Sequence, residues 1–235
     1  MITDAARPRF PAETQIGTAA SADVAIVQTT IHGATMNHLA HLLLAGPHPD
    51  HRLGALLGDH LKGRLVLEPL RPELRRGILL HRRIDHWSDH HPAVVDLRRR
   101  FQGSWRRYGG IMLDVLFDHM LDRHWERFGD RPLACFAEEI DALLQAHVDE
   151  FPPRLARFSQ WALAMNLWRS FGDRHMLNRI FLGIARRHGR ESPLIAGLEL
   201  LDRHEAAIEA TFLELFPDLM HSARNWRRIG RDYSS

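Results

Sequence analysis

The segment 111–122 constrains the fold of this chain more than any other. It reads IMLDVLFDHMLD, an almost continuous apolar run interrupted every four residues by Asp114, Asp118 and Asp122. Residues four apart on a helix share one face, so the segment predicts a buried helix that carries carboxylates along one side. Burying a carboxylate is costly unless it is paired or bound to a metal. We therefore expect this segment to form a buried helix, and we expect a functional role for Asp118.

The chain from residue 36 onward reads as a succession of helical patterns separated by glycine and proline, with no strand ladder and no internal repeat. Gly109–Gly110 is expected to break the chain, and Pro217 to end the last long helix. The sequence predicts an all-α, single-domain helical bundle of about nine helices. The expected helices span residues 37–45, 50–62, 72–90, 93–107, 111–122, 133–148, 155–170, 176–188 and 196–216.

Residues 1–35 differ from the rest, because they contain scattered proline and glycine and no sustained periodicity. We expect a poorly ordered N-terminal extension followed by one helical domain over residues 36–235, and Met36 is a candidate start of translation.

Composition narrows the class of protein. The chain has 235 residues, of which 45% are hydrophobic and 26% charged, as in soluble globular proteins. It contains neither an apolar run of the roughly 20 residues that cross a bilayer nor a secretory signal pattern. The single cysteine, Cys135, excludes an internal disulfide and a cysteine-rich zinc site. These features predict a cytoplasmic protein with no membrane or nucleic-acid partner.

The motif His81-Arg82-Arg83-Ile84-Asp85 lies within the expected helix 72–90. His81 and Asp85 are four residues apart, so that imidazole and carboxylate share a face and form half of a divalent-metal site. Arg82 and Arg83 carry the forked donors that suit phosphate oxygens. The alternative is an exposed i,i+4 ion pair.

Two further candidates lie in apolar helical segments. His41 sits among leucines, where it is either a metal ligand or a core histidine with a hydrogen-bond partner. Asp59 is either a ligand or an exposed residue on a polar face. Together with the motif at 81–85 and the pair Asp118-His119, they form a set of histidines and aspartates from four expected helices. Such a ligand set favours a hydrolase site for Mn, Mg or Fe. The set is His41, Asp59, His81, Asp85, Asp118 and His119.

A basic cluster follows, with Arg98, Arg99, Arg100, Arg106 and Arg107 interleaved with aromatic residues. It is either a solvated helical face or a docking surface for an acidic protein.

Four motifs in order resemble the bacterial acyl carrier protein phosphodiesterase family, over about residues 36–220. They are MNHLAHL at 36–42, GALLGD at 54–59, HRRID at 81–85 and LDVLFDH at 113–119. The segment 207–217 also fits the C-terminal helix of that family.

The resemblance implies an all-helical fold related to the HD-domain phosphohydrolases. It implies removal of the 4′-phosphopantetheine arm from holo acyl carrier protein, an acidic partner, with Mn²⁺ or Mg²⁺, or else Fe²⁺, as cofactor. The order Asp118-His119 is the reverse of the HD pattern, and the relative shares of His41 and Asp114 in the ligand set stay open.

The expected mechanism places a metal on His81, Asp85 and Asp118, with Asp59 and His119 completing or bridging the site. A metal-activated water attacks the phosphodiester. Arg82 or Arg83 stabilises the added charge, and a protonated histidine or the metal assists departure of the serine oxygen. The alternatives are an HD-type hydrolase of nucleotides or small phosphoesters, and a non-catalytic helical module that binds the carrier protein.

Overall fold

The computed structural model describes residues 38–61, 67, 69–188 and 192–229. Within these ranges the chain forms ten α-helices, three short 3₁₀ helices and no strand, which confirms the all-α, single-domain prediction. The expected extension, 1–35, lies outside the described residues. The helices are α2 (His38–Leu44), α3 (Pro49–Leu57), α4 (Pro72–His90), α5 (Pro92–Arg99), α6 (Ser104–Arg123), α7 (Trp125–Phe128), α8 (Leu133–His147), α9 (Pro153–Ala164), α10 (Arg174–His188) and α11 (Gly197–Ile229).

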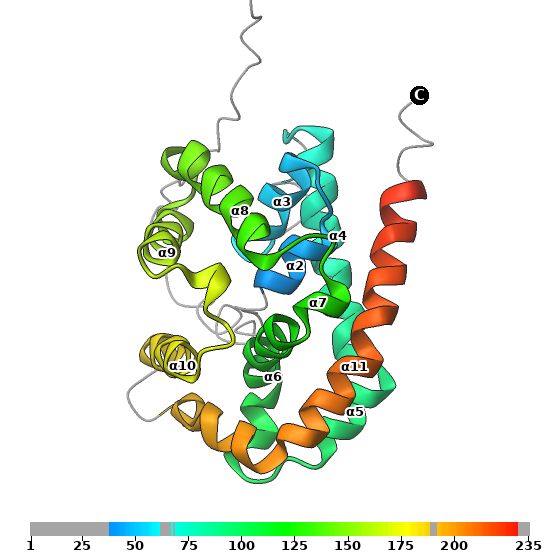
Figure 1. Ribbon diagram of the computed structural model, residues 1–235, viewed down its shortest axis with the longest axis vertical. Coiled ribbons are helices and arrows are strands. Elements are labelled where there is room, and N and C mark those ends of the chain that lie inside the picture. Colours follow the sequence, from blue (N-terminus) through cyan, green and yellow to red (C-terminus); the bar gives the residue numbers. More distant parts are fainter. Residues whose placement is uncertain (1–37, 62–66, 68, 189–191, 230–235) are drawn as a thin grey trace, which may run out of the picture.

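The helix α6 lies in the middle of the bundle. Figure 1 shows α8, α9 and α10 along one side of the molecule, α4, α5 and α11 along the other, and α2 and α6 between them. The helices α2, α5, α10 and α11 all contact α6. Its second half is buried on almost every side, from Val115 to Leu121. The prediction that the segment 111–122 forms a buried helix is therefore confirmed.

The helices α3 and α4 cross with their backbones in contact. A Cβ atom built on Gly54 would lie 2.7 Å from the Cα of Gly77, so only glycine fits at this crossing. The close approach fixes α3 against α4. It thereby brings the segment that follows α3 beside the middle of α4.

The break predicted at Gly109–Gly110 is wrong, because α6 runs through both residues. The chain turns instead at Gly103, whose φ of 59° lies in the left-handed region that glycine adopts easily. Gly109 allows the ring of Phe101 to pack against α6, because a Cβ at this position would lie 2.5 Å from that ring. The expected helix 93–107 is accordingly divided between α5 and the start of α6.

The predicted end of the last helix at Pro217 is also wrong. Pro217 lies inside α11, which continues to Ile229. Proline removes one N–H donor from the helix ladder, but flanking contacts can maintain the helix. Here Phe212, Leu215, Phe216 and Leu219 around the proline are all buried in the core, and Figure 1 shows α11 curving around the bundle.

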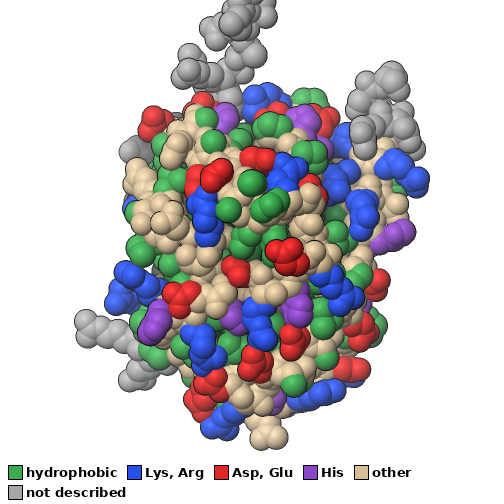
Figure 2. Space-filling view, in the orientation of Figure 1, with side chains coloured by type: hydrophobic (Ala, Val, Ile, Leu, Met, Phe, Trp, Pro, Cys, Tyr) green, Lys and Arg blue, Asp and Glu red, His purple; other side chains and the backbone are tan. Residues whose placement is uncertain are grey.

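No helix in the described ranges is both long and apolar enough to cross a bilayer. On the face shown in Figure 2, acidic and basic side chains are interspersed with hydrophobic ones.

Candidate metal site

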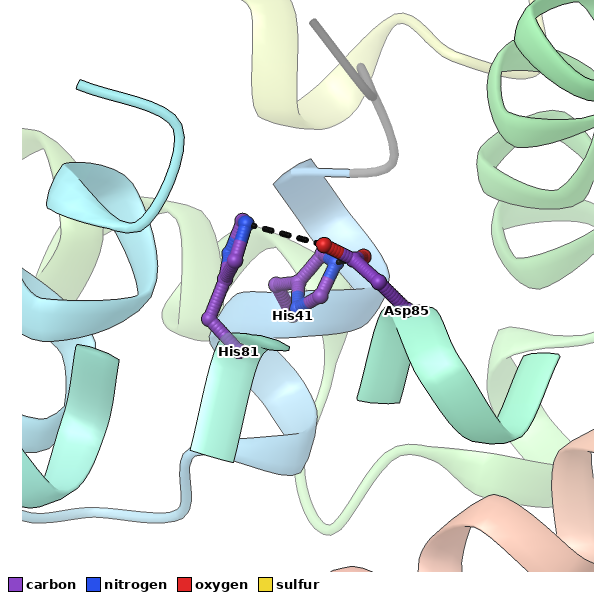
Figure 3. Close-up of side chains that lie close together, drawn as sticks. All are labelled: His41, His81 and Asp85. Carbon is purple, nitrogen blue, oxygen red and sulfur yellow. Dashed lines mark hydrogen bonds and ion pairs between the residues drawn. The ribbon is translucent and has the colours of Figure 1, made fainter. Parts of the chain in front are cut away.

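Three predicted residues meet between α2 and α4. His41 comes from α2, and His81 and Asp85 come from successive turns of α4 (Figure 3). Their candidate ligand atoms all lie within 4.8 Å of one another. His41 Nε2 is 2.9 Å from Asp85 Oδ1, and His81 Nε2 is 3.3 Å from Asp85 Oδ2. We call these three residues the His–His–Asp cluster.

The two imidazole rings of the cluster are held in place by packing. They stack with centroids 4.0 Å apart, and both histidines are 1% exposed. Gly58 leaves room for the ring of His81, since a Cβ there would lie only 2.3 Å from it. The i,i+4 spacing predicted the shared face of α4, whereas the contact with α2 arises from the tertiary fold.

Asp59 borders the cluster, with Oδ1 3.5 Å from His81 Nε2. Its side chain is 13% exposed, against 25% for Asp85, so water can reach both carboxylates. Burial raises the pKa of Asp59, but contact with His81 outweighs it, and the net shift is downward. Burial and contact with His41 act on Asp85 in the same way. Both carboxylates are therefore ionised at neutral pH.

The histidines of the cluster shift in opposite directions. Burial, together with the neighbouring His81, lowers the pKa of His41. Burial also acts to lower the pKa of His81, but the adjacent Asp59 and Asp85 raise it overall. A proton on His81 and a metal cation would thus compete for the same carboxylates.

The donor set fits a divalent metal. His81 Nε2 faces Asp59 and Asp85 and is buried, yet it makes no hydrogen bond of normal geometry to a described residue. Buried polar atoms are normally satisfied, so such exceptions call for an explanation. Two imidazoles beside ionised carboxylates supply nitrogen and oxygen ligands of the kind that Mn²⁺ and Fe²⁺ accept.

The structure does not bring Asp118 into the cluster. Its carboxylate is completely buried and accepts hydrogen bonds from the backbone N–H groups of Leu39, at 3.0 Å, and Ala40, at 2.9 Å. These are free donors in the first turn of α2, so Asp118 acts as an N-terminal cap supplied by another helix. Burial raises the pKa of Asp118, and the two N–H groups offset only part of that shift.

His119 also lies apart from the cluster. Its Nδ1 is 2.8 Å from the carbonyl oxygen of Phe171, and no metal-binding group among the described residues includes it. On α6, the side chain of His119 is rotated by about 100° from that of Asp118. It therefore faces Phe171 and not the start of α2.

The two arginines of the α4 motif have protein partners of their own. Arg82 donates to the carbonyl oxygen of Leu61, two residues beyond Asp59. Arg83 lies over the ring of Trp226, 4.4 Å from its centroid, and 5.9 Å from that of Trp87. Arg82 is thus beside the segment that carries Asp59, whereas Arg83 joins α4 to α11.

Two further residues lie near the cluster: His38, which the sequence did not indicate, and Asp114, whose share in the ligand set was left open. His38 precedes His41 by one turn; burial lowers its pKa to about 3, so it stays neutral. Asp114 lies on the α6 face that approaches α4, where burial and the charges of Asp85, Asp89 and Asp59 raise its pKa. The helical spacing of each from a predicted ligand was the available signal.

A family model described as acyl carrier protein phosphodiesterase matches residues 36–219. Three similar proteins carry the name acyl carrier protein phosphodiesterase. The one from Photorhabdus laumondii is 30% identical over 191 residues, covering 81% of this chain and 96% of the relative. The one from Salmonella paratyphi A is 32% identical over 189 residues, covering 80% and 97%. The one from Yersinia pestis is 30% identical over 191 residues, covering 81% and 98%. No solved structure matched the chain.

Proposed function

Because the chain belongs to the acyl carrier protein phosphodiesterase family, we propose that it hydrolyses the phosphodiester between 4′-phosphopantetheine and the serine of holo acyl carrier protein. The products are apo carrier protein and 4′-phosphopantetheine. The observation that carries the proposal is the His–His–Asp cluster, which lies within the matched residues.

We further propose that His41, His81 and Asp85 hold a divalent cation, with Asp59 at its edge. Mn²⁺ or Fe²⁺ suits this set better than Mg²⁺, because Mg²⁺ prefers oxygen ligands and imidazole nitrogen suits transition metals. The cation would supply Lewis acidity to the phosphate and to the attacking water.

The residues of the chain supply the remaining chemistry. Asp59 is ionised, water-accessible and beside the cluster, so it is placed to accept a proton from the attacking water. Arg82 is the better placed of the two predicted arginines to bind the phosphate oxygens, because it lies next to the segment of Asp59. The contacts of Arg83 and His119 favour structural roles, and we assign them no step.

The test is incubation of the protein with holo acyl carrier protein and Mn²⁺, read by intact mass. Loss of the phosphopantetheine mass is expected with the wild-type protein and not with Asp85→Asn. The matched control is Asp89→Asn, one turn further along α4, where the carboxylate is 61% exposed and pairs with Arg98. It should keep activity within about threefold of wild type, as expected for a surface ion pair.

Two outcomes would redirect the proposal. Release of phosphate from small diesters or nucleotides, with an unchanged carrier protein, would favour the small-phosphoester hydrolase. Metal-independent binding of the carrier, with no change in its mass, would favour the non-catalytic module.

A further inference from the structure

The junction between α5 and α6 is strongly basic. Five arginines and two aspartates lie between residues 89 and 107. Both aspartates are already paired, Asp89 with Arg98 at 3.2 Å and Asp96 with Arg99 at 2.8 Å. The other three arginines are exposed and make no ion pair with any described residue. We call Arg100, Arg106 and Arg107 the junction patch.

The local structure does not explain the patch as a stabilising feature. Arg106 and Arg107 lie in the first turn of α6, where the helix dipole favours anions and disfavours cations. That turn has no acidic residue, and Gly103 provides no side-chain cap. The free N–H groups of a 20-residue helix therefore add to the positive potential of the arginines.

The patch also contains apolar surface. Trp105 and Tyr108 are half-buried between the arginines, and the guanidinium of Arg107 lies 5.5 Å from the Tyr108 ring centroid. Aromatic side chains and arginine are the residues most enriched at protein–protein contacts.

Two helices connect the patch with the residues around the cluster. Arg107 and Asp114 are seven residues apart on α6, so they share a face and are separated by about 10 Å along the axis. Asp114 in turn is close enough to Asp85 and Asp59 that their negative charges raise its pKa. On the α4 side, Asp89 is one turn beyond Asp85 and pairs with Arg98 of α5. The helices α4 and α6 thus each connect the patch with the residues around the cluster.

The proposed reaction requires a protein to lie on this surface. The bond to be cut joins a serine side chain to phosphate, so the carrier's own backbone must approach the cluster closely. A typical interface covers about 800 Å² on each partner, equivalent to a disc of about 16 Å radius. A contact of that radius centred on the cluster exceeds the roughly 10 Å that separates Arg107 from Asp114 along α6.

From these observations, and resting on the proposed function, we infer that the junction patch receives an acidic surface of the carrier protein and orients its modified serine toward the His–His–Asp cluster. The patch acts on encounter and orientation. It takes no part in the chemical step.

The test uses the triple variant Arg100→Glu, Arg106→Glu, Arg107→Glu. Its kcat/KM for holo carrier protein should fall at least about tenfold near 0.05 M salt, mainly through KM, because electrostatic steering and complementarity are reversed. The loss should shrink toward about 0.5 M salt, where exposed charges are screened. Turnover of bis(p-nitrophenyl) phosphate, which needs no docking, should stay unchanged.

The matched control is Arg127→Glu, Arg179→Glu, Arg186→Glu on α7 and α10. These arginines are exposed and make no ion pair with any described residue. The helix α10 lies on the opposite side of the bundle from α5 (Figure 1). The change in net charge is the same. An equal loss in the control, or no loss in the patch variant, would overturn the inference.

A charge swap tests the partner directly. Carrier protein whose acidic surface residues near the modified serine are replaced by lysine should bind wild type poorly and the patch variant better. Binding is measured with Asp85→Asn, which is expected not to turn over. Patch-dependent binding without release of phosphopantetheine by wild type would support the docking surface and contradict the proposed function. Turnover that does not depend on the patch would support the proposed function and contradict the docking surface.

Discussion

Two His/Asp pairs, one on α4 and one on α6, have opposite surroundings. On α4, the Nε2 atom of His81 lies near Asp85 and His41 but makes no hydrogen bond of normal geometry. On α6, Asp118 and His119 have backbone partners from α2 and from Phe171. Burial alone therefore does not mark a ligand. The distinguishing feature is whether the polar atoms of the buried group are already used by the protein.

The largest effect is expected at the cluster itself. His81→Ala should reduce Mn²⁺ affinity and carrier turnover by more than about 1,000-fold. Mutation of a residue that only hydrogen-bonds to a metal ligand already costs about 10- to 100-fold, and loss of a ligand itself should cost more. Titration calorimetry and intact mass measure the two quantities. Wild-type affinity in this variant would show that the metal binds elsewhere.

Asp118→Ala should act mainly on stability. It leaves two buried N–H groups of α2 without acceptors, so the free energy of unfolding of the metal-free protein should fall by about 3 kcal/mol. Mn²⁺ affinity should fall by only about 10- to 100-fold, because His41 is less firmly positioned. Urea denaturation checks the first value. Complete loss of metal binding with unchanged stability would identify Asp118 as a ligand instead.

Gly58→Ala tests the space beside His81. The new Cβ, 2.3 Å from the ring, must displace it, and Mn²⁺ affinity should fall about tenfold. The control is Gly183→Ala in α10, where a Cβ meets nothing within 4 Å. That change should leave Mn²⁺ affinity intact and stabilise the helix by about 1 kcal/mol. Equal Mn²⁺ affinities in the two variants would contradict the packing account.

The smallest effect is expected at His119. His119→Gln should lower the free energy of unfolding by about 1 kcal/mol through loss of the contact with Phe171, and should keep most of the activity. Thermal denaturation and the carrier assay provide the readouts. Loss of Mn²⁺ binding in this variant would restore the predicted role of His119 as a ligand.

The sequence predicted what helical periodicity determines. It gave the all-α class, the buried position of α6 and the shared face of His81 and Asp85, because these depend on residues close in the chain. It could not show whether Asp118 caps a helix or binds a metal, since either role places an aspartate in an apolar helix. The difference depends on the position of the first turn of α2, about 80 residues earlier in the chain.

The two wrong helix boundaries have the same origin. Gly109 normally indicates a break, but here it makes room for Phe101. Pro217 normally indicates an end, but the apolar face of α11 continues to pack on both sides of it. In both cases tertiary contacts override a local signal.

The most direct test of the central claim is anomalous diffraction at the manganese edge from crystals grown with Mn²⁺. We predict a peak at bonding distance from His41, His81 and Asp85, with Asp118 still hydrogen-bonded to the first turn of α2. A peak ligated by Asp118 and His119, with the His–His–Asp cluster empty, would contradict it.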